Sequence, residues 1–205
     1  SCGTRYPIVG GLPRFAGSEN YARSFGLQWS RHSRSQIDKF TGLSISRERF
    51  FGVTGWPKNL EGDLILEAGS GAGRFTQIVC ETGAEVFSFD YSRAVEVNRE
   101  NNKECANLHI FQGDIFEIPL KKDLFDKIFC FGVLQHTPDP ERAFRCLAGF
   151  VKPGGHLAID IYRKSFSALL SWKYLLRPLT HRIPKERLYT IIAAVVPPLL
   201  PAASW

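Results

Sequence analysis

Short apolar runs alternate with longer segments that are apolar on one side only through the middle of the chain. The short runs predict strands, because a strand covered on both faces reads as nearly continuous apolar residues. The predicted strands are residues 64–66, 85–89, 108–112, 125–131 and 156–162.

The segments between these runs predict helices. Residues 73–82 place their apolar side chains on one helical face. Ser92 is expected to cap a polar helix that runs to about residue 105, and Asp139-Pro140 is a strong helix start. Further helices are predicted at residues 21–40, 46–53, 165–176 and 185–196, and a turn at residues 152–155.

This alternation predicts an α/β fold. Strands that alternate with helices form right-handed βαβ units, so we expect a Rossmann-like parallel sheet with helices on both faces. The expected organisation has three parts: N-terminal helices and a basic segment (1–59), a ligand-binding core (60–162) and a basic helical C-terminal segment (163–205).

Composition narrows the class of protein. The chain has 205 residues and is 44% hydrophobic and 22% charged, which is typical of a globular protein. It has no uninterrupted apolar run of about 18 residues, and no apolar core for a signal peptide near its start, so we expect a cytoplasmic protein without a transmembrane span. Five cysteines without a C-x-x-C pair argue against a disulfide scaffold or a complete zinc knuckle. The absence of Met suggests a fragment.

The charge is unevenly distributed. Residues 1–60 carry nine Lys or Arg against three Asp or Glu, residues 61–161 ten against sixteen, and residues 162–205 seven against one. An acidic centre is therefore flanked by two basic arms. The arms either dock on the acidic centre or are solvated, or they meet an anionic substrate, a lipid surface or nucleic acid.

A glycine-rich segment follows the first predicted strand. Gly69, Gly71 and Gly73 lie between that strand and the next helix. Glycine tolerates positive φ and allows close backbone approach, and a helix start offers free N–H groups. Such a turn at the carboxyl edge of a parallel sheet typically binds nucleotide-like ligands, although it can also be only a tight turn.

Acidic residues end the next two strands. Asp90 follows the second strand, where a carboxylate can accept hydrogen bonds from a ribose diol. Asp114 follows the third, where it can accept from the exocyclic amine of adenine while the backbone N–H of Ile115 faces a ring nitrogen. Each acid alone could be a helix cap, but three such features at successive strand ends favour one binding site.

These motifs resemble the class I S-adenosylmethionine-dependent methyltransferases, especially the group called methyltransferase type 11. The resemblance covers residues 60–162 and rests on five motifs that occur in order. They are Glu-Ala-Gly-Ser-Gly-Ala-Gly (67–73), Asp90, Gln-Gly-Asp-Ile (112–115), the run from Phe-Asp-Lys-Ile (125–128) to Gly-Val-Leu-Gln-His-Thr-Pro-Asp-Pro (132–140), and Lys-Pro-Gly-Gly (152–155).

The resemblance implies an S-adenosylmethionine cofactor and an acceptor that is a small molecule, anionic or lipid-like. It implies that the glycines and the residues after the fourth strand border the methionine part, that Asp90 holds the ribose, and that Glu67 organises the polar network near the amino-acid end. The cofactor-binding residues it implies are Glu67, Gly69, Gly71, Gly73, Asp90, Tyr91, Asp114, Ile115, Gly132 and Val133.

His136 is the candidate general base. It follows the fourth strand, near the transferable methyl group that the resemblance implies, and its ordinary pKa is near 6.5. The alternative is that His136 only shapes the loop or binds substrate. Methyl transfer needs no metal, and none is expected: the N-terminal segment resembles the tail of a zinc-ribbon-like element, but only one ligand-type residue, Cys2, is present.

Three other functions remain open. A nicotinamide-dependent oxidoreductase would need a small residue where Arg74 stands. A non-catalytic module could keep the cofactor fold without activity. A nucleic-acid methyltransferase is disfavoured, since no Asn/Asp-Pro-Pro-Tyr/Phe loop follows the fourth strand.

The C-terminal end departs from the family pattern. We expect the sheet to lack the last two strands of the family fold, because no strand pattern follows residue 162. The chain is then truncated, or the basic and apolar segment 165–201 forms an acceptor-binding lid or contacts a membrane surface.

Overall fold

A computed structural model of the chain describes residues 3–17, 34, 36–161, 180, 182–184, 187, 188 and 190–195. The chain divides into two units, Ser1–Tyr162 and Arg163–Trp205. In the second unit, residues 187–188 and 190–195 are helical, which agrees with the helix predicted at residues 185–196. The predicted helix at 165–176 and most of that at 21–40 lie outside the described residues.

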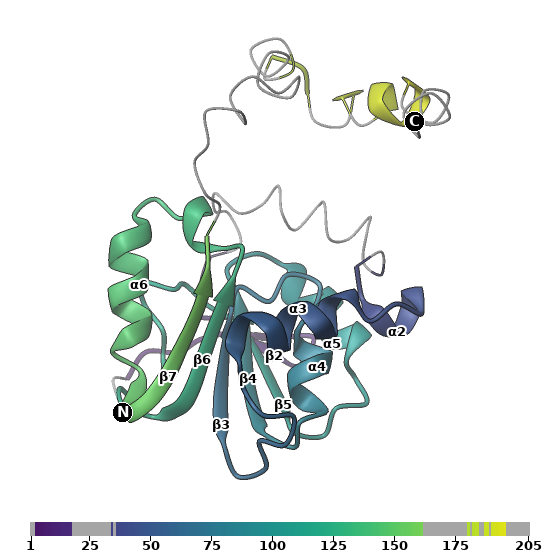
Figure 1. Ribbon diagram of the computed structural model, residues 1–205. Coiled ribbons are helices and arrows are strands. Elements are labelled where there is room, and N and C mark those ends of the chain that lie inside the picture. The colour runs from purple at the N-terminus through teal and green to yellow at the C-terminus, as the bar shows by residue number, and fades with distance from the viewer. Residues whose placement is uncertain are drawn as a thin grey trace. The chain divides into compact units, whose positions relative to one another are not determined.

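The first unit is built on a parallel sheet of five strands in the order β5-β4-β3-β6-β7. Figure 1 shows all five strands running in the same direction, so that their carboxyl ends share one edge. The strands are β3 (Leu64–Ala68), β4 (Glu85–Asp90), β5 (Leu108–Gln112), β6 (Phe125–Phe131) and β7 (Val151–Asp160). The α/β prediction is confirmed.

Strand alternation builds two cores, one on each face of the sheet. On β3, Ile65 is buried in one core and Leu66 in the other. On β6, Ile128 joins Leu66, while Phe129 joins Ile65. Successive strand residues point to opposite faces, so continuous apolar runs are what a doubly covered sheet requires.

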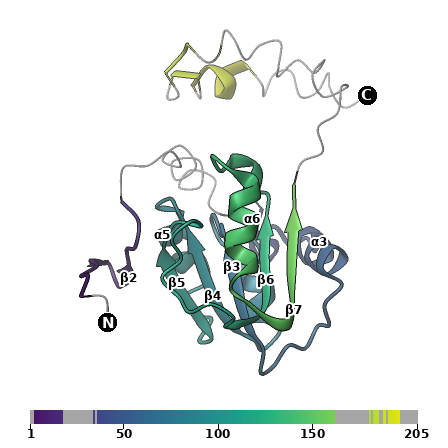
Figure 2. The same ribbon diagram turned by 90° about the vertical axis from the view of Figure 1, so that its left-hand side faces the viewer.

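Helices cover both faces. The Leu66 side is covered by α6 (Pro140–Ala148), which buries Ala143 and Leu147. The Ile65 side is covered by α3 (Ile45–Thr54) and α4 (Thr76–Cys80). Figure 2 shows α6 in front of the sheet and α3 behind it. The remaining described helices of this unit are α2 (Asp38–Thr41), α5 (Ala94–Asn101) and the 3₁₀ helix η1 (Leu134–His136).

Capping residues fix where several helices begin and end. The Asp139 side chain accepts a hydrogen bond from the Arg142 N–H at 2.9 Å, and Pro140 occupies the first turn, as predicted. Gly55 ends α3 in a left-handed conformation that disfavours other residues. The predicted helix 46–53 is confirmed by α3.

Three predicted boundaries were wrong. The helix expected at residues 73–82 is confined to α4, because residues 71–75 form turns around the glycines. The helix expected from Ser92 begins at Ala94 and ends at Asn101. Residues 152–155 belong to β7 instead of preceding it, and the register against β6 shifts there. Gly154 has φ 80°, so this Pro-Gly-Gly run makes an irregularity inside the strand.

The N-terminal segment extends the β5 edge of the sheet. Strands β1 (Ile8–Val9) and β2 (Leu12–Pro13) form a hairpin around Gly10-Gly11, both at positive φ as a two-residue hairpin turn requires. The Phe15 N–H donates to the Gln112 carbonyl at 2.8 Å, and Arg14 makes a parallel bridge to the same residue. This contact protects a strand edge that would otherwise be open.

Candidate functional site

The glycine-rich loop crosses the carboxyl end of β3. The N–H groups of Gly69 and Ser70 both donate to the Phe89 carbonyl, at 2.8 and 3.0 Å, which fixes the loop to β4. A Cβ at Gly69 would lie 2.3 Å from a methyl carbon of Val133. Only glycine fits at this position, which also has φ 81°.

Asp90, at the end of β4, is tied to the same loop. One carboxylate oxygen accepts from the Gly71 N–H at 2.9 Å, and the other accepts from the Ser92 N–H and hydroxyl at 2.8 and 2.7 Å. Burial raises the pKa of Asp90, although the bonds from Ser92 and Gly71 oppose this. A carboxylate has about four acceptor sites, so roughly one remains for a ligand.

The loops after β4 and β5 meet. The Gly113 N–H donates to the Asp90 carbonyl at 3.1 Å, and the Gln112 side chain donates to the Tyr91 carbonyl at 2.9 Å. Burial raises the pKa of Tyr91, and the nearby Asp114 carboxylate raises it further. Asp90 and Asp114 therefore belong to neighbouring loops in direct contact, as one nucleoside ligand requires.

Ile115 follows Asp114 and is buried in the core on the α6 side of the sheet. Because its side chain faces the core, only its backbone can face a ligand. The Asp114 carboxylate accepts from the Phe116 N–H at 2.9 Å, which holds this loop in shape.

Glu67 lies beneath the glycine-rich loop and is only 2% exposed. One carboxylate oxygen accepts from the Thr76 hydroxyl at 2.5 Å and from the Ser88 hydroxyl at 2.7 Å. The Asn98 amide donates to both hydroxyls at 3.1 Å. Burial raises the pKa of Glu67 to about 7, against the effect of the two hydroxyl bonds. These contacts connect β3, α4, β4 and α5 under the loop.

The same network surrounds Gly73. The Asn102 amide donates to the Asn98 side-chain oxygen at 2.7 Å and to the Gly73 carbonyl at 3.3 Å. A Cβ at Gly73 would lie 2.2 Å from that Asn98 oxygen. Gly73 therefore gives the polar network room, which the sequence did not indicate.

Gly132, Val133 and His136 follow β6. Gly132 has φ 68°, and its N–H donates to the Asp160 carboxylate at the end of β7. Val133 lies against Gly69, as the close approach above shows. His136 ends η1 with an exposed side chain, and its N–H donates to the Val133 carbonyl at 2.8 Å. All three residues lie at the carboxyl edge of the sheet.

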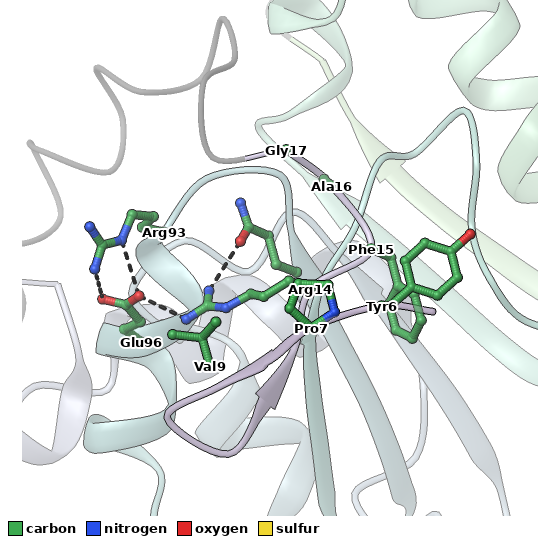
Figure 3. A pocket seen from close by; sticks show the side chains of 10 residues that line it. Tyr6, Pro7, Val9, Arg14, Phe15, Ala16, Gly17, Arg93 and Glu96 are labelled. Atoms are coloured by element: carbon green, nitrogen blue, oxygen red, sulfur yellow. Dashed lines mark hydrogen bonds and ion pairs between the residues drawn. The ribbon is translucent and has the colours of Figure 1, made fainter. Parts of the chain in front are cut away.

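A pocket of about 650 Å³ lies between the N-terminal hairpin and the β4–β5 side of the sheet. Figure 3 shows Arg14 between two partners. Its guanidinium donates to the Gln112 side chain at 3.1 Å and to Glu96 at 2.8 Å. Tyr6 and Phe15 form the aromatic side of this pocket, with ring centroids 4.9 Å apart. It adjoins the Asp90 region through Gln112 and Tyr91.

The geometry fits an adenosyl cofactor. The Ser70 hydroxyl, inside the glycine-rich loop, is buried and has no hydrogen-bond partner among the described residues. Buried hydroxyl groups in native proteins are rarely left without a hydrogen bond, so we expect a ligand or a water molecule to complete this one. Asp90 retains acceptor capacity beside it, and glycines allow a ligand to approach the backbone. No cluster of three potential metal ligands occurs in the described part of the chain.

Comparison with known proteins identifies the core. Residues 66–159, from β3 to β7, match the family model described as a methyltransferase domain. The matched segment lies within the first unit and spans somewhat less than half of the 205-residue chain. The match favours the methyltransferase interpretation over a nicotinamide-dependent oxidoreductase.

The methyltransferase domain has curated relatives. A protein named ubiquinone biosynthesis O-methyltransferase from Coxiella burnetii is 35% identical over 114 residues, which cover 54% of this chain and 48% of that protein. One of the same name from Alkalilimnicola ehrlichii is 33% identical over 58% of this chain and 51% of its own length. The chain thus spans about half the length of these relatives.

Solved structures share the fold. A protein from Methanococcus maripaludis, described as a putative S-adenosyl-L-methionine-dependent methyltransferase, matches with a TM-score of 0.56 and 19% identity. The match covers 85% of this chain and 83% of that one. At this identity the likeness supports the Rossmann-like fold of the methyltransferase domain. Among the described residues, no helix is long and apolar enough to cross a membrane.

Sequence reasoning missed several residues around the methyltransferase domain's site. Asn98 lies on α5 and Asn102 caps its end, in a segment that read as polar, yet both are buried under the loop. Their spacing of four residues, which places them on one helical face, was the available signal. Nothing in the sequence indicated a role for Arg14, since only the tertiary structure brings it into contact with Gln112 and Glu96.

Proposed function

We propose that this protein transfers a methyl group from S-adenosylmethionine to a hydroxyl group of a small molecule. The observation that carries the proposal is the contact between the loops after β4 and β5 beside the glycine-rich loop, which makes the loops that carry Asp90 and Asp114 neighbours. The names of the curated relatives support an oxygen-directed reaction.

Different residues of the chain hold different parts of the cofactor. Asp90 accepts from the ribose, and Asp114 with the Ile115 backbone binds the adenine. Tyr91, which follows Asp90 directly, would contact the nucleoside. Gly69, Gly71 and Gly73 shape the loop for the methionine part, which Gly132 and Val133 border. Glu67 supports the loop from below through Thr76 and Ser88.

When bound, S-adenosylmethionine would supply an electrophilic methyl group on a sulfonium sulfur, and the electron pair of the carbon–sulfur bond would remain on that sulfur after transfer to the acceptor oxygen. His136 takes the hydroxyl proton of the acceptor. Its exposed ring at the end of η1 can reach a ligand at the sheet edge and can return the proton to solvent. The protein otherwise contributes orientation.

Asp90→Ala should weaken binding of S-adenosylhomocysteine by about tenfold to a hundredfold, because charged hydrogen bonds to the ribose are lost. Isothermal titration calorimetry measures this directly. Asp139→Ala is the matched control: it removes a helix cap at about 1 kcal/mol but lies outside the proposed cofactor site. Unchanged affinity in Asp90→Ala would refute the ribose assignment.

His136→Ala should lower kcat by about tenfold or more and leave S-adenosylhomocysteine binding unchanged, since the histidine acts on the acceptor proton. Steady-state kinetics with an accepted substrate, together with calorimetry, separates the two effects. Equal kcat in both proteins would remove His136 from the catalytic role.

A panel of hydroxyl acceptors tests the proposed activity as a whole. Methyl transfer to small hydroxyl compounds supports the proposal. Binding of S-adenosylhomocysteine without transfer to any of them would favour a non-catalytic module. Preferred transfer to compounds presented in vesicles would identify a lipid-like acceptor and would give the basic arms a role at the membrane surface.

A further inference from the structure

Arg14, in the N-terminal segment, is buried against the edge of the sheet. Its side chain is only 8% exposed, and arginine is rarely buried unless it is paired. The guanidinium donates to the Glu96 carboxylate at 2.8 Å, a bond drawn in Figure 3, and to the Gln112 side-chain oxygen at 3.1 Å. Arg14 therefore connects the N-terminal segment to α5 and to the end of β5.

The other end of the Gln112 amide contacts the loop after β4. Its nitrogen donates to the Tyr91 carbonyl at 2.9 Å. Gln112 is only 3% exposed, so water has little access to this side chain. Arg14, Gln112 and Tyr91 thus form a continuous series of hydrogen bonds that ends at the residue after Asp90.

The guanidinium determines which way the Gln112 amide faces. An amide has a donor end and an acceptor end of nearly the same shape, so its orientation is set by its partners. Arginine can only donate, so it selects the amide oxygen and leaves the nitrogen for the Tyr91 carbonyl. A Gln112 amide turned the other way would place two oxygens against each other at Tyr91.

The Tyr91 carbonyl belongs to the peptide unit that orients Asp90. The N–H of the same unit is that of Ser92, and it donates to the Asp90 carboxylate at 2.8 Å. A peptide unit is planar, so a rotation that moves the Tyr91 carbonyl also moves the Ser92 N–H. The bond from Gln112 therefore holds a donor that fixes the Asp90 carboxylate.

Resting on the proposed function, we propose that Arg14 is a positioning residue for the Asp90 carboxylate. Arg14 orients the Gln112 amide, and this amide holds the peptide unit between Tyr91 and Ser92. The N-terminal segment thereby contributes to the nucleoside site through other residues, although it lies outside the segment that matches the methyltransferase family.

Arg14→Met should weaken binding of S-adenosylhomocysteine to the full chain by about fivefold to tenfold, because the hydrogen bond that orients a buried amide is lost. The same factor is expected for 5′-methylthioadenosine, which lacks the amino-acid end, since Asp90 is proposed to bind the ribose. Isothermal titration calorimetry measures both affinities at a temperature where a thermal melt shows each protein folded. A loss for S-adenosylhomocysteine alone would overturn the proposal.

Arg14→Leu repeats the test with a second apolar shape, so that poor packing of one variant does not decide the result. Arg99→Met is the matched control. Arg99 is an exposed residue of α5, and its guanidinium donates to the Gly10 carbonyl in the turn of the same hairpin. We expect its affinity to stay within about twofold of wild type, because exposed contacts contribute little. Equal losses in Arg14→Met and Arg99→Met would show that only docking of the hairpin matters, which overturns the proposal.

A double-mutant cycle decides whether Arg14 acts through Gln112. Gln112→Met removes the amide and should weaken S-adenosylhomocysteine at least as much as Arg14→Met does. In the Gln112→Met background, Arg14→Met should cause no further loss of affinity, because residues that act in series are not additive. Additive losses would show that Arg14 acts by another route and would overturn the proposal.

The wild-type measurement separates this inference from the proposed function. If wild type binds neither nucleoside ligand, the proposed function fails and the inference fails with it. If wild type binds both ligands and the two Arg14 variants bind them equally well, only the inference is overturned.

Discussion

Gly73→Ala should lower the free energy of unfolding by about 3 kcal/mol, with loss of S-adenosylhomocysteine binding. The added Cβ would lie 2.2 Å from the Asn98 side-chain oxygen and 2.3 Å from the Asn102 amide nitrogen. Both asparagines are buried, and their mutual hydrogen bond of 2.7 Å lies at that point. The variant must break this bond and accept left-handed backbone strain, each at roughly 1–2 kcal/mol.

Gly62→Ala is the matched control. Gly62 has φ 88°, close to the 86° of Gly73, but a Cβ there would meet no atom within 4 Å. It therefore carries the backbone strain alone, about 1 kcal/mol. Urea unfolding of both variants measures the difference. Equal losses in the two proteins would show that the Asn98–Asn102 network accommodates the methyl group.

Glu67→Gln should remove a pH dependence of stability that amounts to about 3 kcal/mol in wild type. Burial raises the pKa of Glu67 from 4.5 to about 7. Between these values the folded state holds a proton that the unfolded chain has released, so the free energy of unfolding falls as the pH rises through that window. Each pKa unit corresponds to about 1.4 kcal/mol. Glutamine keeps an oxygen for the Thr76 and Ser88 hydroxyls but cannot ionise.

Urea unfolding at pH 5, 6, 7 and 8 measures this effect as the difference between wild type and variant, so that groups shared by both proteins cancel. We expect the variant to gain on wild type steadily up to about pH 7 and to keep that gain above it. Glu61→Gln makes the same substitution at an exposed residue and serves as the matched control. Parallel curves for Glu67→Gln and wild type would contradict the raised pKa.

These two predictions concern one structure, the polar network that supports the glycine-rich loop. Glu67, Thr76 and Ser88 lie at one end of it, and Asn98 and Asn102 at the other. The glycine-rich loop carries the proposed cofactor contacts on the side opposite this network. Substitutions in the network should therefore change ligand binding as well as stability. Buried polar networks behave this way when each member depends on the others.

The sequence by itself determined that the core is a parallel sheet, which segments of the chain form its strands, and which loops carry the proposed site. Short continuous apolar runs that alternate with helical segments favour strands buried on both faces, and glycines or acids directly after parallel strands gather at one edge of the sheet. The positions of Gly69 and Asp90 follow from this rule. The helix boundary at α4 and the irregular start of β7 did not follow, because turns around Gly73 and Gly154 depend on local φ values that no periodicity encodes.

Only the tertiary structure decided which polar residues are buried and which of those lack partners. Asn98 and Gln135 both carry an amide side chain, and nothing in the sequence distinguishes their environments. One is satisfied by Thr76 and Ser88, whereas the other has no partner among the residues described. The physical reason is that hydrogen-bond satisfaction depends on atoms brought together from distant strands and helices, whereas apolar periodicity is a local property of the chain.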